Sequence, residues 1–252
     1  MKKLENKTAI ITGASSGMGK SMAILFAAEG ANVVVADLKQ EAINEVVMQI
    51  KSAGGNAIGV VCDVSSESAV QQLIEATISK YSTLDILVNN AGIMDDFTPA
   101  ESVSNDLWNR VMAVNVNGPF YACRLAVPIM VQQGKGVIIN ISSVGGLFGA
   151  RAGLAYTTSK HALIGLTKNI GWMYANKGIR CNAIAPGGVN TNIVKNMQPD
   201  PFGMERCITD GAKLTRMGEP EEIAKLALFL ASDDASFITG EVVTADGGWT
   251  AY

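Results

Sequence analysis

A tyrosine and a lysine four residues apart are the pair in this sequence best suited to acid–base chemistry. Tyr156 and Lys160 fall in the segment Leu154–Asn176, whose pattern predicts a helix, so both side chains lie on one face, one turn apart. A free tyrosine titrates at about 10, but one nearby ammonium group, interacting by roughly 4 kcal/mol, is expected to lower its pKa by about three units. The phenol would then titrate at about 7, where general acid–base catalysis is most effective.

A serine upstream supplies a third group. Ser143 follows the apolar run Val137–Ile141, and a hydroxyl at the end of a strand can donate a hydrogen bond to a carbonyl oxygen as charge develops on it. The pattern Y-x-x-x-K alone occurs often by chance on the surface of amphipathic helices. Its position after a loop rich in Gly and Ser, and downstream of a glycine-rich turn, favours the catalytic interpretation over a surface pair.

The glycine-rich turn is the segment TGASSGMG at Thr12–Gly19, between the first predicted strand and the first predicted helix. Gly13 permits a turn that a side chain would obstruct, Gly17 lets the backbone approach a pyrophosphate, and Gly19 lets helix and strand pack closely. The phosphates would lie on the free N–H groups at the positive end of the helix dipole. The spacing G-x-x-x-G-x-G differs from the G-x-G-x-x-G of the dinucleotide fingerprint, so a purely structural turn is the alternative.

An acidic residue ends the second predicted strand. Asp37 lies near the offset of roughly 20 residues expected of a ribose-binding acid, where its carboxylate would accept hydrogen bonds from the adenosine ribose. It would repel a 2′-phosphate by roughly 4 kcal/mol, which favours NAD over NADP unless Lys20 or Lys39 compensates. The alternative for Asp37 is a cap on the following helix. For Asp63, which ends the third strand, an adenine contact and a cap for the helix starting within Ser65–Gln72 are equally favoured.

Short β-branched runs alternate with longer helical patterns along the chain. The predicted strands are Thr8–Thr12, Asn32–Ala36, Ala57–Cys62, Ile86–Asn89, Val137–Ile141, Arg180–Ile184 and Val242–Ala245. The predicted helices are Gly17–Ala28, Lys39–Ser52, Glu67–Lys80, Asn105–Gln133, Leu154–Asn176 and Pro220–Ala231. Several of these strands are apolar throughout, and their alternation with helices predicts an α/β fold, a doubly wound, seven-stranded parallel sheet with helices on both faces. No linker divides the chain, so we expect a single Rossmann-type domain over residues 1–252.

One segment, Asn190–Gly218, interrupts this alternation. It combines prolines with scattered apolar residues, among them Met197, Phe202 and Met204. Long insertions after the carboxyl end of a strand are where α/β proteins build pockets, so we expect a mobile substrate lid at about 190–218 and a hydrophobic or cyclic substrate.

Composition excludes several classes of protein. The net charge of 20 − 23 = −3 gives no general attraction to phosphate backbones or anionic lipids, so we expect no nucleic-acid or membrane partner. The chain has no apolar run of roughly 18 residues, and its start, MKKLENKTAI, has no apolar secretory core. The four cysteines are dispersed and there is one histidine: Cys62, Cys123, Cys181, Cys207 and His161. This pattern predicts reduced thiols, a cytoplasmic protein and no metal site.

Together these motifs resemble the short-chain dehydrogenase/reductase family, in its single-domain type, from about Lys7 to Gly248. The matching pieces, in chain order, are TGASSGMG, Asp37, Asp63-Val64, NNAG at Asn89–Gly92, Asn115, Ser143, Tyr156 with Lys160, and PGGVNT at Pro186–Thr191. The resemblance implies an NAD(H)-dependent oxidoreductase that interconverts a secondary alcohol and a ketone, with NADP the less favoured cofactor.

The resemblance also implies roles for residues. Tyr156 would be the acid/base and Ser143, rather than its neighbour Ser142, the anchor of the substrate carbonyl. Lys160 would hold the nicotinamide ribose and lower the pKa of the phenol, and Asn115 would order a water in a proton relay to Lys160. The implied cofactor contacts are Gly13, Ser15, Ser16, Gly17, Met18, Gly19, Asp37, Leu38, Cys62, Asp63, Val64, Asn89, Asn90, Ala91, Gly92, Tyr156, Lys160, Pro186, Gly187, Val189 and Thr191. The implied substrate contacts are Met94, Ser143, Val144, Tyr156 and Gly188.

Other chemistry-bearing residues have simpler interpretations. The adjacent carboxylates Asp95 and Asp96 would have to face each other across a substrate to act as an acid–base pair, so a solvated loop is favoured for both. His161 follows Lys160 and therefore points in another direction, so we expect it to be structural.

Subunit contacts and two rival functions complete the expectations. The apolar stripe within Asn105–Gln133, with Trp249 and Tyr252 near the end of the chain, indicates a homodimer or homotetramer, as the family commonly forms.

One rival function is an NADPH-dependent 3-oxoacyl-carrier-protein reductase, against which Ser16 and Asp37 argue. The other, of a different class, is a non-catalytic nucleotide-binding sensor or scaffold, against which the complete catalytic set argues.

Overall fold

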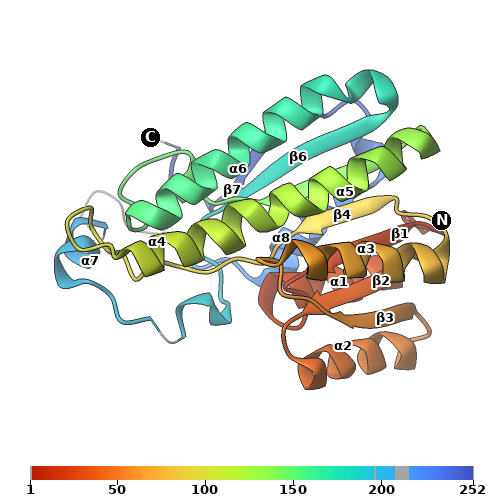
Figure 1. Ribbon diagram of the computed structural model, residues 1–252, viewed down its shortest axis with the longest axis horizontal. Coiled ribbons are helices and arrows are strands. Elements are labelled where there is room, and N and C mark those ends of the chain that lie inside the picture. Colours follow the sequence, from red (N-terminus) through yellow and green to blue (C-terminus); the bar gives the residue numbers. More distant parts are fainter. Residues whose placement is uncertain (1, 196, 208–215, 252) are drawn as a thin grey trace.

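A computed structural model of the protein describes residues 2–195, 197–207 and 216–251. Seven parallel strands form one sheet in the order β3-β2-β1-β4-β5-β6-β7 (Figure 1). The strands are β1 Thr8–Thr12, β2 Asn32–Asp37, β3 Asn56–Val61, β4 Ile86–Asn89, β5 Gly136–Ile141, β6 Ile179–Pro186 and β7 Val242–Ala245. This is the doubly wound Rossmann-type sheet that the sequence predicts, with every predicted strand present within two residues of its expected bounds.

Helices cover both faces of the sheet. They are α1 Gly17–Ala28, α2 Gln40–Ser52, α3 Glu67–Tyr81, α4 Asn105–Met112, α5 Gly118–Gln133, α6 Leu154–Met173, α7 Pro201–Cys207 and α8 Pro220–Ala231. On one face, α1, α2 and α8 pack against strand residues such as Ile11 and Val35. On the other, α3, α5 and α6 pack against Ile10 and Val34. Because side chains alternate along a strand, a strand covered on both faces needs apolar residues at every position, which is why the predicted runs do not alternate.

The predicted helix Asn105–Gln133 is divided in the structure. A π-helical turn at Ala113–Asn117 separates α4 from α5, which the sequence pattern did not predict. The side chain of Asn115 in this turn is buried and exchanges two hydrogen bonds of 2.9 Å with the backbone of Ile93. A π turn inserts one extra residue into the helix, and π turns often occur at functional sites.

Two other segments differ from expectation. The helix predicted over Leu154–Asn176 ends at Met173, followed by a 3₁₀ turn at Ala175–Lys177. Helix α7 forms inside the segment expected to be an irregular lid, and Figure 1 shows it at the opposite end of the molecule from the N-terminus. Within the described ranges, no helix is both long enough and apolar enough to cross a bilayer.

Candidate active site

The predicted functional residues gather at the carboxyl edge of the sheet. The strand order reverses between β1 and β4, and open α/β sheets bind ligands in the crevice at such a point. Gly13 follows β1, Asn90 follows β4 and Ser142 follows β5, while Asp37 and Pro186 are the last residues of β2 and β6. The fold therefore brings five separate segments of the chain to one edge.

The glycine-rich turn is braced by the segment after β4. Gly13 has a φ of +61°, in the left-handed region, and the Asn90 amide nitrogen donates hydrogen bonds to the carbonyl oxygens of Thr12 (2.8 Å) and Gly13 (3.1 Å). A Cβ at Gly19 would lie 2.1 Å from the Gly13 oxygen, so only glycine fits there. Ser16, the N-cap of α1, makes no capping bond with its side chain, which leaves the first N–H groups of α1 available to an anion.

Asp37 faces the glycine-rich turn and does not cap a helix. Its Oδ2 accepts hydrogen bonds from the Ser15 backbone N–H (3.0 Å) and hydroxyl (2.7 Å), and its Oδ1 accepts one from the Leu38 N–H (2.7 Å). The N-cap of α2 is Lys39, so the capping alternative for Asp37 is wrong. A carboxylate offers about four lone-pair sites, so one remains on Oδ1 for a ribose hydroxyl.

Asp63 shapes its own turn. Its Oδ1 accepts hydrogen bonds from the Ser65 N–H (2.9 Å) and hydroxyl (2.7 Å). The N-cap of α3 is Ser66, whose hydroxyl accepts a bond of 3.4 Å from the Ala69 N–H, so Asp63 is not the cap of this helix. The adenine contact stays a prediction.

The other predicted cofactor residues differ in accessibility. Leu38 is 62 % exposed, whereas Cys62 and Asn89 are buried. The Asn89 amide donates a hydrogen bond of 2.8 Å to the Asn140 side chain on β5, so it belongs to a network inside the sheet and its side chain is not open to a ligand. Half-buried around the crevice are Ser15, Gly17, Met18, Val64, Ala91, Gly92, Gly187, Val189 and Thr191, and Pro186 is buried.

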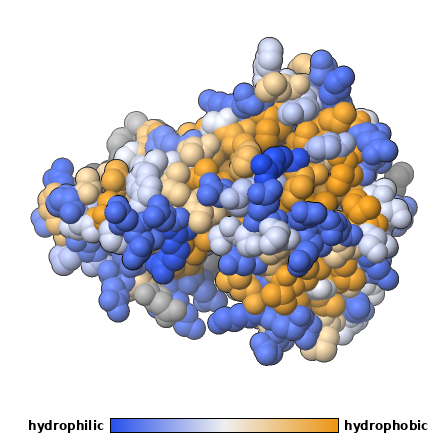
Figure 2. Space-filling model, in the orientation of Figure 1, coloured by the Kyte–Doolittle hydropathy of each residue, from blue (hydrophilic) through white to orange (hydrophobic). Residues whose placement is uncertain are grey.

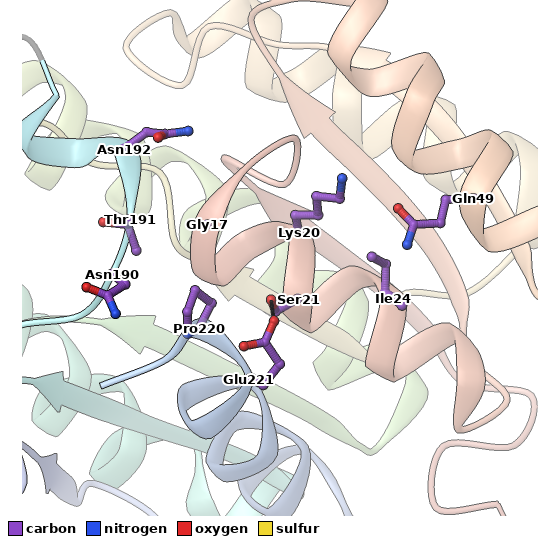
Figure 3. A pocket seen from close by; sticks show the side chains of 10 residues that line it. All are labelled: Gly17, Lys20, Ser21, Ile24, Gln49, Asn190, Thr191, Asn192, Pro220 and Glu221. Carbon is purple, nitrogen blue, oxygen red and sulfur yellow. Dashed lines mark hydrogen bonds between the residues drawn. The ribbon is translucent and has the colours of Figure 1, made fainter. Parts of the chain in front are cut away.

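A hollow of about 550 Å³ opens beside the glycine-rich turn, between α1, the start of α8 and residues 190–192 (Figure 3). Gly17 and Thr191 meet at its wall, where a Cβ at Gly17 would lie 3.2 Å from the Thr191 Cβ. The Ser21 hydroxyl donates a hydrogen bond of 2.9 Å to Glu221 across it. Gly17 and Thr191, two of the predicted cofactor contacts, line this hollow, whereas none of the predicted catalytic residues does.

The two adjacent serines after β5 have different partners. Ser142 is buried and its hydroxyl donates to the Lys160 carbonyl oxygen (3.1 Å). Ser143 is half-buried and its Oγ accepts a hydrogen bond from the Gly145 N–H (3.0 Å). A Cβ at Gly145 would lie 3.4 Å from this Oγ and 3.6 Å from the Tyr156 Cε1, so Ser143 and the phenol ring border the same space. The geometry therefore pairs Ser143, and not Ser142, with the tyrosine.

Lys160 is buried on the same helix as Tyr156. Its Nζ donates a hydrogen bond of 2.8 Å to the Ile141 carbonyl oxygen at the end of β5 and lies 5.4 Å from the centroid of the Tyr156 ring. Burial lowers the pKa of Lys160 to about 8, because removal from water disfavours its charged form.

The pKa of Tyr156 moves in the direction opposite to our prediction. Burial raises it to about 12, the nearby Ser143 hydroxyl lowers it in part, and the charge of Asp95 adds to the rise. The Lys160 ammonium is bonded to Ile141 and is itself desolvated, so it does not offset the burial of the phenol. The prediction of a lowered phenol pKa is wrong for the protein by itself.

Asn115 lies beside the lysine. Its amide nitrogen donates to the Ile93 carbonyl oxygen (2.9 Å) and the Ser159 hydroxyl (3.1 Å), and its Oδ1 accepts from the Ile93 N–H. A Cβ at Gly92 would lie 3.3 Å from the Asn115 Oδ1 and 3.4 Å from the Lys160 Nζ, so the two side chains share one small space. Both amide hydrogens of Asn115 are donated to protein groups, so only the oxygen atoms of Asn115 can bind a water.

Asp95 is not in a solvated loop, contrary to our expectation. It is fully buried, and its carboxylate accepts hydrogen bonds from the backbone N–H groups of Gly153 (3.0 Å) and Tyr156 (2.8 Å). Burial raises the pKa of the carboxyl, and these backbone bonds oppose that rise. Asp95 was missed in the sequence analysis because its partners are 58 and 61 residues away. The one available signal was Gly153, which stands directly before the predicted helix and has no side chain to cap it. Asp96 is half-buried.

A second hollow of about 400 Å³ lies between the start of α6 and α7, and none of the predicted substrate contacts is among its lining residues. Met94 and Gly188 are half-buried, and Val144 is 2 % exposed. The hollow is lined by Phe97, Thr98, Pro99, Ala100, Gly149, Ala150, Ala152, Gly153, Leu154, Thr157, Phe202, Gly203, Arg206 and Cys207. Residues 196 and 208–215 of the expected lid lie outside the described part of the chain.

Residues expected to be structural or at subunit contacts have partners within the chain. His161 is exposed and its Nδ1 is hydrogen-bonded to the Thr157 carbonyl oxygen (2.9 Å). Trp249 packs against its own chain, with the Arg151 guanidinium 4.6 Å from the ring centroid, and Tyr252 lies outside the described residues. The cysteines are free, three of them buried.

Comparison with known proteins identifies the family. A family profile described as "Enoyl-(Acyl carrier protein) reductase" matches residues 13–250. The chain belongs to the short-chain dehydrogenase/reductase family. It is 46% identical over 251 residues to 3beta-hydroxysteroid dehydrogenase 2 of Eggerthella lenta, covering 99% of this chain and 96% of that one. It is 38% identical over 249 residues to cyclohexanol dehydrogenase of an Acinetobacter species, covering 99% and 97%.

A solved structure gives the same fold. A crystal structure from Beutenbergia cavernae, with NADP bound at low occupancy, matches with a TM-score of 0.89 and 35% identity over 99% of each chain. Together with the relatives, it supports an oxidoreductase that acts on an alcohol or ketone with a nicotinamide cofactor.

The site of this short-chain dehydrogenase/reductase fits a dinucleotide. The cradle at Gly19, which a Cβ would fill, and the uncapped start of α1 suit a pyrophosphate, while Asp37 retains an acceptor for a ribose hydroxyl. Among the residues that the structure describes, no three His, Cys, Asp or Glu side chains are grouped to hold a metal ion.

Proposed function

We propose that this protein is an NAD(H)-dependent oxidoreductase that interconverts a secondary alcohol and a ketone. The observation that carries the proposal is the cluster after β5, where Ser143 and Tyr156 border the same space and the Tyr156 ring centroid lies 5.4 Å from the buried Lys160 Nζ. A phenol, a hydrogen-bond donor and a cation held together at the carboxyl edge of the sheet suit proton transfer to or from an alcohol oxygen.

Each side chain has a defined part in the proposed reaction. In the reducing direction, the Tyr156 hydroxyl donates its proton to the ketone oxygen, and in the oxidising direction the phenolate takes the proton of the alcohol. The Ser143 hydroxyl donates a hydrogen bond to that oxygen as it gains charge. The Lys160 ammonium would bind the ribose next to the nicotinamide. Asn115 would anchor a water that carries the proton between Lys160 and solvent, outward during alcohol oxidation and inward during ketone reduction, so that Tyr156 is restored for the next turnover. A bound nicotinamide supplies the hydride acceptor or donor and, when oxidised, a positive charge that favours the phenolate.

NAD rather than NADP is the proposed cofactor. Asp37 lies at the end of β2 and is fixed toward the glycine-rich turn by three hydrogen bonds, two of them from Ser15. A 2′-phosphate placed about 4 Å from this carboxylate would be repelled by roughly 4 kcal/mol at an effective dielectric of about 20. Ser16, in the same turn, offers no positive charge to compensate.

The proposed substrate is an apolar, alicyclic alcohol or ketone, with a 3β-hydroxysteroid as the first candidate. Helix α7, which lies inside the segment expected to cover the substrate, borders an apolar hollow whose wall includes Phe97, Pro99 and Phe202. The hydroxysteroid and cyclohexanol dehydrogenases are both similar to this chain over nearly its whole length. We propose residues 190–218, which include α7, as the segment that covers the substrate.

Initial rates on a panel of substrates test this proposal. The panel contains a 3β-hydroxysteroid, cyclohexanol, a β-keto thioester and an enoyl thioester, each with NAD(H) and NADP(H). We expect the steroid or cyclohexanol with NAD⁺ to give the highest kcat/KM, and the Tyr156→Phe variant to lose about 10²- to 10⁴-fold in kcat while it still binds NADH. Tyr174→Phe, near the end of the same helix, is the matched control and should retain activity. Preference for the β-keto thioester with NADPH, or full activity of Tyr156→Phe, would refute the proposal.

We also propose a homotetramer or homodimer, located in the cytoplasm. Figure 2 shows apolar side chains gathered over the face of α5 and α6. Phe120 is 42 %, Trp172 83 % and Met173 53 % exposed on these helices, and large exposed apolar patches mark interfaces. Light scattering should give a mass of two or four chains; the mass of one chain would reject the assembly.

A further inference from the structure

The first turn of α6 has no capping side chain of its own. The helix begins at Leu154, and its N-cap is Gly153, which has no side chain to accept a hydrogen bond. The first N–H groups of a helix find no acceptor within it and need one from elsewhere. Tyr156 is the third residue of α6, so the backbone of this first turn determines the position of the phenol.

A turn from another part of the chain binds these N–H groups. The two carboxylate oxygens of Asp95 accept hydrogen bonds from Gly153 (3.0 Å) and Tyr156 (2.8 Å). The Thr98 carbonyl oxygen accepts one from Leu154 (3.0 Å). The turn is closed by the Thr98 N–H and hydroxyl, which donate to the Asp95 carbonyl oxygen at 3.0 and 2.6 Å. Three N–H groups at the start of α6 are thus held by one turn that begins at Asp95.

The same turn is held on its other side by α7. The Asp200 N–H donates a hydrogen bond of 2.8 Å to the Asp96 carbonyl oxygen. A Cβ at Gly203 would lie 1.8 Å from the Phe97 carbonyl oxygen, so the helix backbone rests directly on the turn. Asp96 and Phe97 have φ values of +55° and +57°, which residues other than glycine rarely adopt. Such a conformation persists only where the surroundings fix it.

The packing around the carboxylate leaves no free space. Asp95 has no exposed surface, and a Cβ at Gly153 would lie 2.6 Å from one of its carboxylate oxygens. The N-cap of α6 is therefore glycine because the carboxylate takes the place of its side chain. A negative charge at this end of a helix is also favoured by the helix dipole.

We propose that Asp95 is a positioning residue for the reaction of Tyr156: its buried carboxylate caps α6 from outside and fixes the place at which the phenol hydroxyl meets the substrate oxygen. This inference rests on the proposed function, because it assigns Asp95 to the same site. Asp95 acts through the backbone of Tyr156 and does not contact the substrate.

Asp95 also acts on the site through its charge. The titratable groups on which its charge acts are Tyr156 on α6 and Cys207 on α7, and Arg151, in the loop before α6, acts on Cys207 as well. After burial, the main cause, the charge of Asp95 raises the pKa of both Tyr156 and Cys207, whereas Arg151 lowers that of Cys207. Removal of the carboxylate charge should therefore let the phenol ionise at lower pH.

The test compares Asp95→Asn with Asp96→Asn. The amide at position 95 has nearly the same size but offers one acceptor oxygen in place of two and carries no charge, whereas Asp96 faces no N–H of α6 and the same change there is the matched control. We expect Asp95→Asn to lose about 10- to 100-fold in kcat, as a shift of the reacting group by about 1 Å would cause. KM for NAD⁺ and the affinity for NADH should stay within about twofold, and the pH profile of kcat for alcohol oxidation should move to lower pH. Asp96→Asn should match the unchanged protein in all of these.

Two measurements do not depend on turnover. Ultraviolet titration, with Tyr156→Phe used to assign the signal, should show Tyr156 ionising at lower pH in Asp95→Asn than in Asp96→Asn. Hydrogen exchange of the unchanged protein should show slow exchange at the Gly153 and Tyr156 amides, which would exchange fast at the uncapped end of a helix. If these amides exchange fast, the inference is wrong even where Asp95→Asn does not fold. It is also wrong if Asp95→Asn keeps kcat within twofold and an unshifted pH profile. If the unchanged protein turns over no alcohol, the proposed function fails, while titration and exchange still decide the role of Asp95.

Discussion

The two halves of the sheet hold their functional residues by different means. In the first half, from β1 to α3, the contacts of the two acidic side chains are the closer in sequence: Asp37 binds Ser15 across 22 residues, and Asp63 binds Ser65 across two. In the second half, from β4 to β6, they are distant: Asn89 binds Asn140 across 51 residues, and Asp95 binds the start of α6 across 58 and 61.

The halves also differ in where they place charge. Asp37 is half-buried and Asp63 is exposed, whereas Asp95, Tyr156 and Lys160 are buried with raised or lowered pKa values. The first half therefore presents a surface for binding, while the second half stores ionisable groups in an environment that disfavours their charged forms. Changes in the first half should mainly alter cofactor choice, and changes in the second half should alter stability and its dependence on pH.

The largest expected effect lies in the first half. Asp37→Ser removes the charge that would oppose a 2′-phosphate, so the ratio of kcat/KM for NAD⁺ over NADP⁺ should fall by up to about a thousandfold, the equivalent of roughly 4 kcal/mol. Steady-state kinetics with both cofactors measures it. Asp63→Asn is the control and should change the ratio far less. An unchanged ratio in Asp37→Ser would mean that another group selects the cofactor.

Residues of the second half should make the free energy of unfolding depend on pH. Burial lowers the pKa of Lys160 from 10.5 to about 8, so between these values the unfolded chain binds more protons than the native protein and the free energy of unfolding rises with pH. The rise amounts to about 3 kcal/mol over the whole interval. Above pH 10 Tyr156 opposes it, because its pKa is raised from 10.0 to about 12 and the unfolded chain loses that proton first.

Denaturant unfolding of the unchanged protein and of Lys160→Met between pH 8 and pH 10 tests this window. The stability of the variant relative to the unchanged protein should fall as the pH rises, because only the unchanged protein gains stability from loss of the buried charge. A difference that does not change with pH would show that the lysine is not forced toward its neutral form.

A moderate loss of stability is expected where α7 rests on the turn after β4. In Gly203→Ala the new Cβ would lie 1.8 Å from the Phe97 carbonyl oxygen, so the helix or the turn must shift, at a cost of about 1–3 kcal/mol. Gly165→Ala is the matched control: that glycine lies on α6 with no atom near the added Cβ, so alanine there should stabilise by up to about 1 kcal/mol. Equal melting temperatures for the two variants would contradict the close contact.

The smallest effect tests strain within that turn. Asp96→Gly relieves a φ of +55° at the cost of a more flexible unfolded chain, so we expect a gain in stability of about 0.5 kcal/mol. Ser82→Gly, at a φ of +63° at the end of α3, should behave alike. If thermal unfolding shows a gain for Ser82→Gly alone, the turn after β4 is not strained and the comparison between the halves weakens.

Much of the fold and part of the site could be predicted because the signals are local. The strands were readable from short β-branched runs, several of them apolar throughout, and Gly13 and Gly19 were readable because their roles depend on neighbours in the turn. The π turn at Asn115 was not readable, since the Asn115 side chain binds the backbone of Ile93 in a loop after β4, and the apolar pattern of the helix carries no sign of that contact. The sign of the Tyr156 pKa shift was mispredicted because the spacing to Lys160 gives proximity but not burial.

The sequence by itself determined the parallel sheet, the glycine-rich turn and the pairing of Tyr156 with Lys160, because apolar runs, glycine conformation and helical spacing act over a few residues. The tertiary structure decided which polar side chains are withdrawn from water and what they bind. Asp95 shows this most clearly: the same carboxylate would be an ordinary surface acid in an open loop, and it becomes a buried cap because the fold brings Gly153 and the first turn of α6 against it.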